Sequence, residues 1–261
     1  MRLELEAATA VVTGAGRGIG AATARLLAAE GVGVAALARS EGDLSALVDE
    51  LERAGGRAVA IVADMSDGAS IDNAFAQARD ALGPIELLVN NAGASPFGPF
   101  DAVTDEQWIE AFTLKVLGYT RAIRAVLPDM RAAGKGRIVN VVGSGGRFAS
   151  PDYALGALNA AMLHLTKSVG DRFAGDGVRV VAVNPGLTST GRMLDALETW
   201  AADAGVSVEQ FTAEHVKSIP LGRAATPEEI AQVICVLCSP LGDLTIGSAF
   251  QADGGGPRGA F

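Results

Sequence analysis

Short apolar runs alternate with longer amphipathic stretches along almost the whole chain. The runs have strand length and are rich in Val, Ile, Leu and Ala, which is typical of parallel strands buried on both faces. They cover residues 10–12, 34–37, 58–62, 87–89, 138–142 and 178–183. The segments between them, such as 19–30 and 70–82, carry apolar residues at helical spacing. This alternation predicts an α/β fold with a doubly wound parallel sheet of about seven strands and helices on both faces.

The alternation continues without an internal repeat, a low-complexity tract or a Pro- and Ser-rich linker. We therefore interpret residues 1–261 as a single domain. The segment at about 191–218 departs from the pattern, because it follows a Pro-Gly turn, is helical in parts, and contains Trp200 and Phe211. In a doubly wound sheet, an insertion at this position is expected to form a lid over a ligand.

Charge and hydropathy exclude several classes of function. Asp and Glu outnumber Lys and Arg by 30 to 21, which gives a formal net charge of −9, and no basic stripe is available to bind a nucleic acid backbone. No apolar run approaches the ~20 residues that a membrane span requires, and the N-terminus does not resemble a signal peptide. We expect a soluble, cytoplasmic protein whose partner is a small molecule.

The two cysteines, Cys235 and Cys238, form a Cys-x-x-Cys pattern within an apolar helical segment. Redox chemistry needs the first cysteine at a helix N-terminus, where its thiolate is stabilised. We therefore interpret both cysteines as small buried hydrophobic residues. No cluster of His, Cys and carboxylate residues has metal-ligand spacing, so no metal site is predicted.

A glycine-rich turn joins the first strand to the first helix, with the sequence Thr-Gly-Ala-Gly-Arg-Gly-Ile-Gly over residues 13–20. Glycines there allow a tight turn, close approach of the backbone to a pyrophosphate, and close packing of the helix on the strand. The helix N-terminus adds free N–H groups and a positive dipole end. We therefore predict a dinucleotide site that includes Gly14, Gly18, Ile19 and Gly20.

Two arginines indicate which dinucleotide the site prefers. Arg39 stands at the end of the second strand, where an acidic residue would favour NAD(H) by binding the ribose 2′-hydroxyl. Arg17 lies inside the glycine turn, and guanidinium groups pair with phosphate in bidentate fashion. We expect both to bind the 2′-phosphate, so that NADP(H) is preferred over NAD(H); the alternative is that both arginines face solvent.

Together with the glycine turn, four further motifs make the chain resemble a short-chain dehydrogenase/reductase over essentially its whole length. They are Ala63-Asp64 after the third strand, Asn90-Asn91-Ala92-Gly93 after the fourth, Pro185-Gly186 with Thr190 after the sixth, and Asp253-Gly254-Gly255 near the C-terminus. The resemblance implies a Rossmann fold that assembles into a homodimer or homotetramer. It also implies roles at the cofactor: Asp64 meets the adenine, Asn91 with Ala92 and Gly93 steadies the site, and Pro185, Gly186, Thr188 and Thr190 border the nicotinamide.

The family's catalytic residues are a Tyr, a Lys four residues later, a Ser and an Asn, and this chain departs from the pattern at all four positions. The sequence over 160–168 matches the family's run after its Lys and sets the register. In that register Leu155 stands at the Tyr position, Asn159 at the Lys position, Gly143 or Val142 at the Ser position, and Lys115 at the Asn position. Leucine cannot transfer a proton, so we expect a rewired active site that lacks the Tyr.

Lysine and asparagine have exchanged places between positions 115 and 159. In the family fold these two positions lie on adjacent helices that face one pocket. Lys115 could therefore bind the nicotinamide ribose or a substrate oxygen from the opposite wall, and partial burial would lower its pKa enough for it to act as an acid. The alternative is a lysine that snorkels, with its head group in water.

Few other side chains could replace the missing acid. Ser144 lies beside the Ser position and could hydrogen-bond a substrate oxygen. Tyr153 lies in a loop just before the Tyr position, from which its phenol could reach the cleft or pack locally. The candidate catalytic residues are therefore Lys115, Ser144, Tyr153 and Asn159.

These features lead to one main hypothesis and two alternatives. We expect an NADP(H)-dependent oxidoreductase that acts on the carbonyl/alcohol pair of a small substrate. The apolar and aromatic residues of the lid segment favour a hydrophobic or aromatic substrate. The alternatives are a catalytically silent NADP(H)-binding subunit or sensor, and a lyase or isomerase built on the same scaffold.

Overall fold

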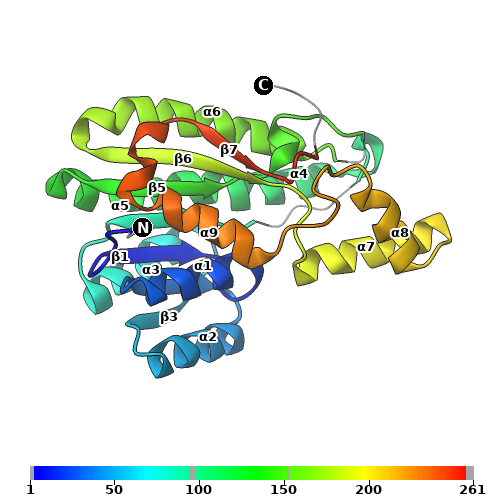
Figure 1. The fold of residues 1–261 in the computed structure, drawn as a ribbon. Helices are drawn as coiled ribbons and strands as arrows, with labels where there is room; N and C mark the ends of the chain where they lie inside the picture. The colour runs from blue at the N-terminus through cyan, green and yellow to red at the C-terminus, as the bar shows by residue number, and fades with distance from the viewer. Residues whose placement is uncertain (1–2, 94–97, 152, 257–261) are drawn as a thin grey trace.

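The computed structural model describes residues 3–93, 98–151 and 153–256, and within them seven strands form one fully parallel sheet (Figure 1). In spatial order the strands are β3 (Ala58–Val62), β2 (Gly33–Ala38), β1 (Thr9–Thr13), β4 (Leu87–Asn90), β5 (Gly136–Val141), β6 (Val178–Pro185) and β7 (Ala249–Ala252). The strand order changes direction between β1 and β4, which is where ligands bind in open α/β sheets. The predicted fold class is confirmed.

Six strands coincide with the predicted apolar runs, and β7 is the seventh. The expectation that every run is buried on both faces is wrong for β3, whose Val62 is 55% exposed. The reason is its place at the edge of the sheet, where one long side of the strand has no neighbour.

Helices cover both faces of the sheet and create two apolar cores. One face carries α1 (Gly18–Ala29), α2 (Glu41–Arg53) and α9 (Pro227–Leu237); the other carries α3 (Gly68–Leu82), α5 (Gly118–Ala133) and α6 (Gly156–Phe173). Neighbouring strand residues enter different cores, as Val12 and Val11 do, because side chains alternate between the two faces of a strand.

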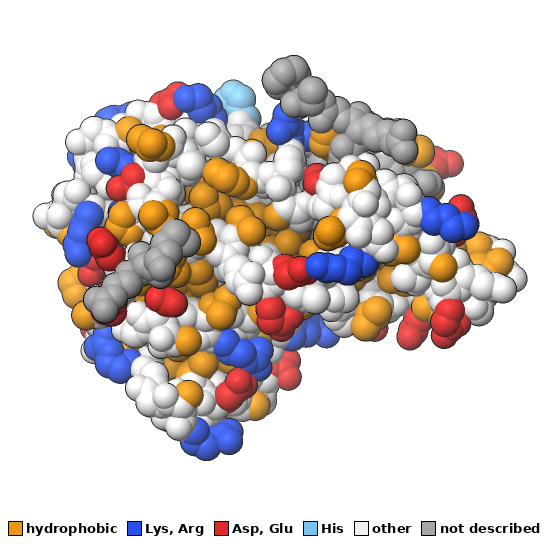
Figure 2. Space-filling view, in the orientation of Figure 1, with side chains coloured by type: hydrophobic (Ala, Val, Ile, Leu, Met, Phe, Trp, Pro, Cys, Tyr) orange, Lys and Arg blue, Asp and Glu red, His pale blue; other side chains and the backbone are white. Residues whose placement is uncertain are grey.

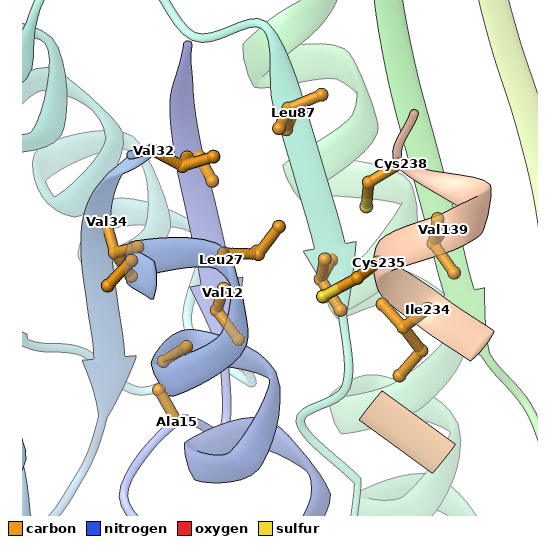
Figure 3. Close-up of a cluster of buried hydrophobic side chains, with 14 of the residues drawn as sticks. Val12, Ala15, Leu27, Val32, Val34, Leu87, Val139, Ile234, Cys235 and Cys238 are labelled. Atoms are coloured by element: carbon orange, nitrogen blue, oxygen red, sulfur yellow. The ribbon is translucent and has the colours of Figure 1, made fainter. Parts of the chain in front are cut away.

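The two cysteines lie in the first of these cores. Figure 3 shows Cys235 and Cys238 among apolar side chains of this core, which include Leu87, Val139 and Ile234. Both are free thiols, and burial raises the pKa of Cys235 to about 12. Their interpretation as small hydrophobic residues is confirmed, with Cys238 at the C-cap of α9 and not within the helix.

Two helices extend from the carboxyl edge of the sheet, at the right of Figure 1. They are α7 (Gly191–Ala204) and α8 (Val208–Val216), and they occupy the segment predicted to be partly helical. On the other side of the edge, α4 (Asp105–Phe112) continues into a π-helix (Thr113–Leu117) and then α5. These elements form the walls above the sheet edge.

The visible surface carries charged side chains of both signs. Figure 2 shows hydrophobic side chains over the middle of one face, with acidic and basic side chains interspersed around them. Within the described ranges, no helix is long and apolar enough to cross a membrane.

Candidate active site

A cleft of about 1440 Å³ lies along the carboxyl edge of the sheet, between the strand ends and the walls formed by α7, α8 and the π-helix. It brings together every predicted site residue except Gly20. The predicted residues that line it are Gly14, Arg17, Gly18, Ile19, Arg39, Asp64, Asn91, Ala92, Gly93, Lys115, Ser144, Tyr153, Asn159, Pro185, Gly186, Thr188 and Thr190.

Two glycines of the turn between β1 and α1 have no room for a side chain. Gly14 has a φ of +66°, and a Cβ there would lie 2.9 Å from Cα of Ala92. Gly20 packs on the turn itself, since its Cβ would lie 2.2 Å from the carbonyl oxygen of Gly14. Gly20 therefore allows close packing of α1 on the turn. The backbone of the turn and the N-terminus of α1 face the cleft.

Asn91 holds this turn in place from the end of β4. Its Nδ2 donates to the carbonyl oxygens of Thr13 and Gly14, each at 3.1 Å. The hydroxyl oxygen of Thr13 in turn accepts from the backbone N–H groups of Asn91 and Ala92, at 2.9 and 3.0 Å. The two loops are thus locked together by hydrogen bonds across the point where the strand order reverses.

The outer end of the cleft carries charged side chains. Arg17 and Arg39 are both exposed and both line the cleft. Asp64 lies nearby after β3, where its Oδ1 accepts from the backbone N–H and the hydroxyl of Ser66, at 2.8 and 2.7 Å. These hydrogen bonds, supported by the positive charge of Arg39, hold the pKa of Asp64 below its usual range.

Lys115 lies in the π-helix and directs its ammonium group inward. Its Nζ donates to the carbonyl oxygen of Val142 and to Oδ1 of Asn159, both at 2.6 Å. The residue is 9% exposed, so the snorkelling alternative is wrong. A π-turn is often found at functional sites, and here it places Lys115 opposite the start of α6.

Burial changes the acidity of this lysine. Removal from water, together with the nearby positive charge of Arg192, lowers the pKa of Lys115 to about 7. Both hydrogen-bond partners of Lys115 are neutral oxygens, so neither cancels the desolvation of the charge. Near neutral pH the ammonium and amine forms therefore coexist at the wall of the cleft.

Asn159 and Gly143 complete this wall, whereas Leu155 does not line the cleft. A Cβ on Gly143 would lie 3.1 Å from Nδ2 of Asn159, and the φ of Gly143 is +115°, so a side chain at this position would be strained. Leu155 is fully buried among Ala111, Leu158 and neighbouring apolar residues. Asn159 thus fills the space next to Gly143 while holding Lys115.

The two remaining catalytic candidates also line the cleft. Ser144 begins a short 3-10 helix after β5. Tyr153 lies across Gly145, where a Cβ would meet two carbons of its ring at 2.9 Å. Tyr119, one helical turn after Lys115, is 1% exposed and donates to the carbonyl oxygen of Val141 at 3.0 Å. Burial raises the pKa of Tyr119 above its usual range, as expected for a structural phenol.

Arg192 was not predicted as a site residue. It is the second residue of α7, is half-buried in the cleft, and donates from Nη1 to the carbonyl oxygen of Gly93 at 3.2 Å. Its position two residues after Thr190, where α7 begins directly after the loop that borders the predicted nicotinamide site, was a signal that could have found it. Among the residues that the structure describes, no group of three or more His, Cys, Asp or Glu side chains could hold a metal ion.

Comparisons with known proteins agree with this geometry. The family model for short chain dehydrogenases matches residues 8–201. A Streptomyces virginiae protein described as a ketoacyl reductase of the monensin polyketide synthase is 40% identical over 253 residues, which covers 94% of this chain and 95% of the relative. The cis-4-hydroxycyclohexanecarboxylate dehydrogenase of Sinomonas cyclohexanicum is 35% identical over 258 residues, covering 94% and 95%.

A solved structure has the same fold. An actinorhodin polyketide ketoreductase variant with NADPH is 31% identical to this chain, matches it with a TM-score of 0.92, and covers 97% of this chain and 98% of its own. The sequence and structure comparisons therefore agree over nearly the full length of the chain. The chain belongs to the short-chain dehydrogenase family.

Proposed function

We propose that the protein is an NADP(H)-dependent oxidoreductase that interconverts a carbonyl compound and the corresponding alcohol, with Lys115 as its acid–base group. The observation that carries this proposal is the buried ammonium of Lys115, which faces the same cleft as the glycine turn. The relatives support the class of reaction, since they include a ketoacyl reductase and a dehydrogenase of a hydroxy acid.

The cleft fits a dinucleotide at its outer half. The Cβ-free surface of Gly14 and Gly18 and the start of α1 offer backbone N–H groups to a pyrophosphate. Arg17 and Arg39 would pair with the 2′-phosphate of NADP(H). The NADPH held by the actinorhodin ketoreductase supports this choice of cofactor. The bound nicotinamide would supply or accept the hydride.

Lys115 handles the proton. Two of the three N–H bonds of its ammonium are used by Val142 and Asn159, so the third is available to the cleft. When a substrate carbonyl carbon gains a hydride, this N–H gives its proton to the oxygen and leaves a neutral amine. In the reverse direction the amine takes the hydroxyl proton as the carbon loses its hydride. A pKa near 7 suits both directions.

The other candidates position the reacting oxygen. We assign the Ser144 hydroxyl and the Tyr153 phenol as hydrogen-bond partners of the substrate, and Asn159 as the residue that positions Lys115. Leu155 is buried in an apolar cluster and does not line the cleft, so we assign it no part in the proton transfer. We assign α7 and α8 as the lid, with Trp200 and Phe211 facing a small hydrophobic or aromatic substrate.

The test is NADPH consumption, followed by absorbance, with a panel of small ketones and aldehydes. We expect turnover with NADPH, and a rate that falls as the pH rises through about 7 because the ammonium form is lost. Calorimetric binding of NADPH without turnover on any panel member would favour the silent subunit instead. Conversion of a substrate without a change in NADPH would favour a lyase or isomerase.

A further inference from the structure

The amino group of Lys115 is held in one orientation. Its Nζ donates to the main-chain carbonyl oxygen of Val142 and to Oδ1 of Asn159, both at 2.6 Å, and all three residues line the cleft. At a tetrahedral nitrogen, the bond to Cε and the two donated N–H bonds leave one further direction. A third N–H bond occupies this direction in the ammonium form, and the lone pair occupies it in the amine form. The neutral amine can therefore present its lone pair to a molecule in the cleft.

The surroundings of Lys115 differ from those of the other lysines. The other three lysines of the chain form ion pairs with carboxylates, which stabilise a positive charge: Lys135 with Glu86, Lys167 with Asp171, and Lys217 with Glu214. Both acceptors at Lys115 are uncharged oxygens. Removal from water then favours the amine and lowers the pKa of Lys115 to about 7. Near neutral pH much of Lys115 is thus in the nucleophilic form.

The cleft has space for a carbonyl compound beside this amine. Its volume of about 1440 Å³ exceeds the ~300–1,000 Å³ of ordinary small-molecule pockets. Trp200 and Phe211 line it and offer aromatic surface to the body of such a compound, and Ser144 lines it with a hydroxyl group that can bind a carbonyl oxygen. A small aldehyde or ketone can therefore reach Nζ from the side of its lone pair.

We propose that Lys115 is also a nucleophile that forms a Schiff base with small aldehydes and ketones in the cleft. The lone pair of Nζ forms a bond to the carbonyl carbon, while the π electrons of the C=O bond move to oxygen. A proton passes from nitrogen to that oxygen and gives a carbinolamine. Uptake of one proton from solvent then releases the oxygen as water and leaves an iminium, with carbon doubly bonded to nitrogen.

This reaction includes no oxidation or reduction, and hydrolysis reverses it. The iminium keeps one N–H bond, which can still donate to the carbonyl oxygen of Val142 or to Oδ1 of Asn159. The activity uses the same lysine as the proposed function but needs no hydride transfer. The two activities can therefore be measured separately.

The test is covalent trapping in the intact protein, with no nicotinamide cofactor added. The protein is incubated near neutral pH with benzaldehyde and sodium cyanoborohydride, which reduces an iminium to a stable amine. Peptide mass spectrometry then measures the benzyl group on each lysine. We expect Lys115 to be modified at least about tenfold faster than Lys135, Lys167 or Lys217, because the ion pairs of those three favour the ammonium form. The α-amino group of the chain also reacts, since its ordinary pKa is about 8, and its peptide is counted separately.

Asn159→Asp tests the part played by the uncharged acceptor. The change keeps the size of the side chain and places a carboxylate against Nζ, which favours the ammonium form. We expect the modification of Lys115 to slow about tenfold or more, while the other three lysines react as before. Asn73→Asp is the matched control, because Asn73 is exposed on α3 and lies outside the cleft. This control should leave the labelling of Lys115 unchanged.

The comparison among lysines in the unmodified protein needs no variant. Modification of Lys115 no faster than that of the other three would overturn the inference, as would an unchanged rate at Lys115 in Asn159→Asp. Consumption of NADPH is measured separately with the panel of ketones and aldehydes. Fast labelling of Lys115 without NADPH consumption would refute the proposed oxidoreductase and support the Schiff base. NADPH consumption without fast labelling would refute only the Schiff base.

Discussion

The side-chain nitrogen of Lys115 and the amide oxygen of Asn159 lie 2.6 Å apart and join the π-helix to α6. The contact is possible because Asn159 occupies the space beside Gly143, where a larger residue would displace it. Lys115, Asn159 and Gly143 therefore constrain one another's positions. A substitution at one of them should alter the contacts made by the other two.

Lys115→Met should fold and lose function. Methionine matches the lysine stem in volume and brings no charge into the interior, but it offers no proton and no hydrogen bond. We expect turnover with NADPH to fall tenfold or more, the loss typical of a missing charge-assisted hydrogen bond. Lys135→Met is the matched control, since Lys135 is exposed and pairs with Glu86. Unchanged turnover in Lys115→Met would show that Lys115 is not the acid–base group.

The same variant should change how stability depends on pH. The folded-state pKa of Lys115 is about 7, below its ordinary value of 10.5, so the unfolded chain binds the proton more tightly. The resulting penalty is complete below pH 7 and disappears as the pH rises toward 10.5. The melting temperature of Lys115→Met relative to the unmodified protein should therefore fall steadily over that range. A difference independent of pH would mean that Lys115 has no lowered pKa.

Exchanging the two residues should restore much of what either single change removes. Asn159→Lys places two ammonium groups against each other, and Lys115→Asn removes the one charge that the wall accommodates. The double variant again has one cation and one amide. We expect a coupling free energy of about 0.5–3 kcal/mol in urea unfolding of the four proteins, the range for residues in contact. Additive effects would mean that the 2.6 Å contact contributes nothing.

Much of this structure could be predicted from the sequence, because local patterns determine it. The strands of apolar residues and the glycine turn over 13–20 follow from short-range sequence. The resemblance to short-chain dehydrogenases implied that Asn91 steadies the site, and its hydrogen bonds to Thr13 and Gly14 agree with that role. The direction of Lys115 could not be predicted, since it depends on the π-turn and on space left by Gly143. Arg192 was missed because its importance comes from a contact with Gly93, 99 positions away.

The relative affinities for NADPH and NADH test the assignment of Arg17 and Arg39 to the 2′-phosphate. Arg17 and Arg39 are exposed there, and both can reach a 2′-phosphate. We expect NADPH to bind at least about tenfold more tightly than NADH, a difference of roughly 1.4 kcal/mol. Arg39→Ala should reduce this ratio without weakening NADH. Calorimetry that gives equal affinities in the unmodified protein, or an unaltered ratio in Arg39→Ala, would contradict the assignment.

A substitution at Gly145 should move the ring of Tyr153 while leaving residue 153 itself unchanged. A Cβ at Gly145 would lie 2.9 Å from Cδ1 and Cε1 of the Tyr153 ring, too close to be tolerated without movement. We expect Gly145→Ala to lower turnover several-fold, while NADPH affinity, measured by fluorescence, stays within about twofold. Gly175→Ala is the control, because a Cβ there meets nothing within 4 Å. Tyr153→Phe tests the hydroxyl separately, and full activity in both variants would remove Tyr153 from the site.

The small number of lysines has a practical consequence. With four in the chain and three of them held by carboxylates on the surface, lysine labelled with ¹³C at Cε should give a spectrum of four signals. The signal of Lys115 is the one expected to move as the pH passes through about 7. Because an approaching anion favours the ammonium form, that signal should move again when an anionic ligand enters the cleft that Lys115 lines. One resonance would then report the charge state of the cleft directly, in the intact protein and without any knowledge of its substrate.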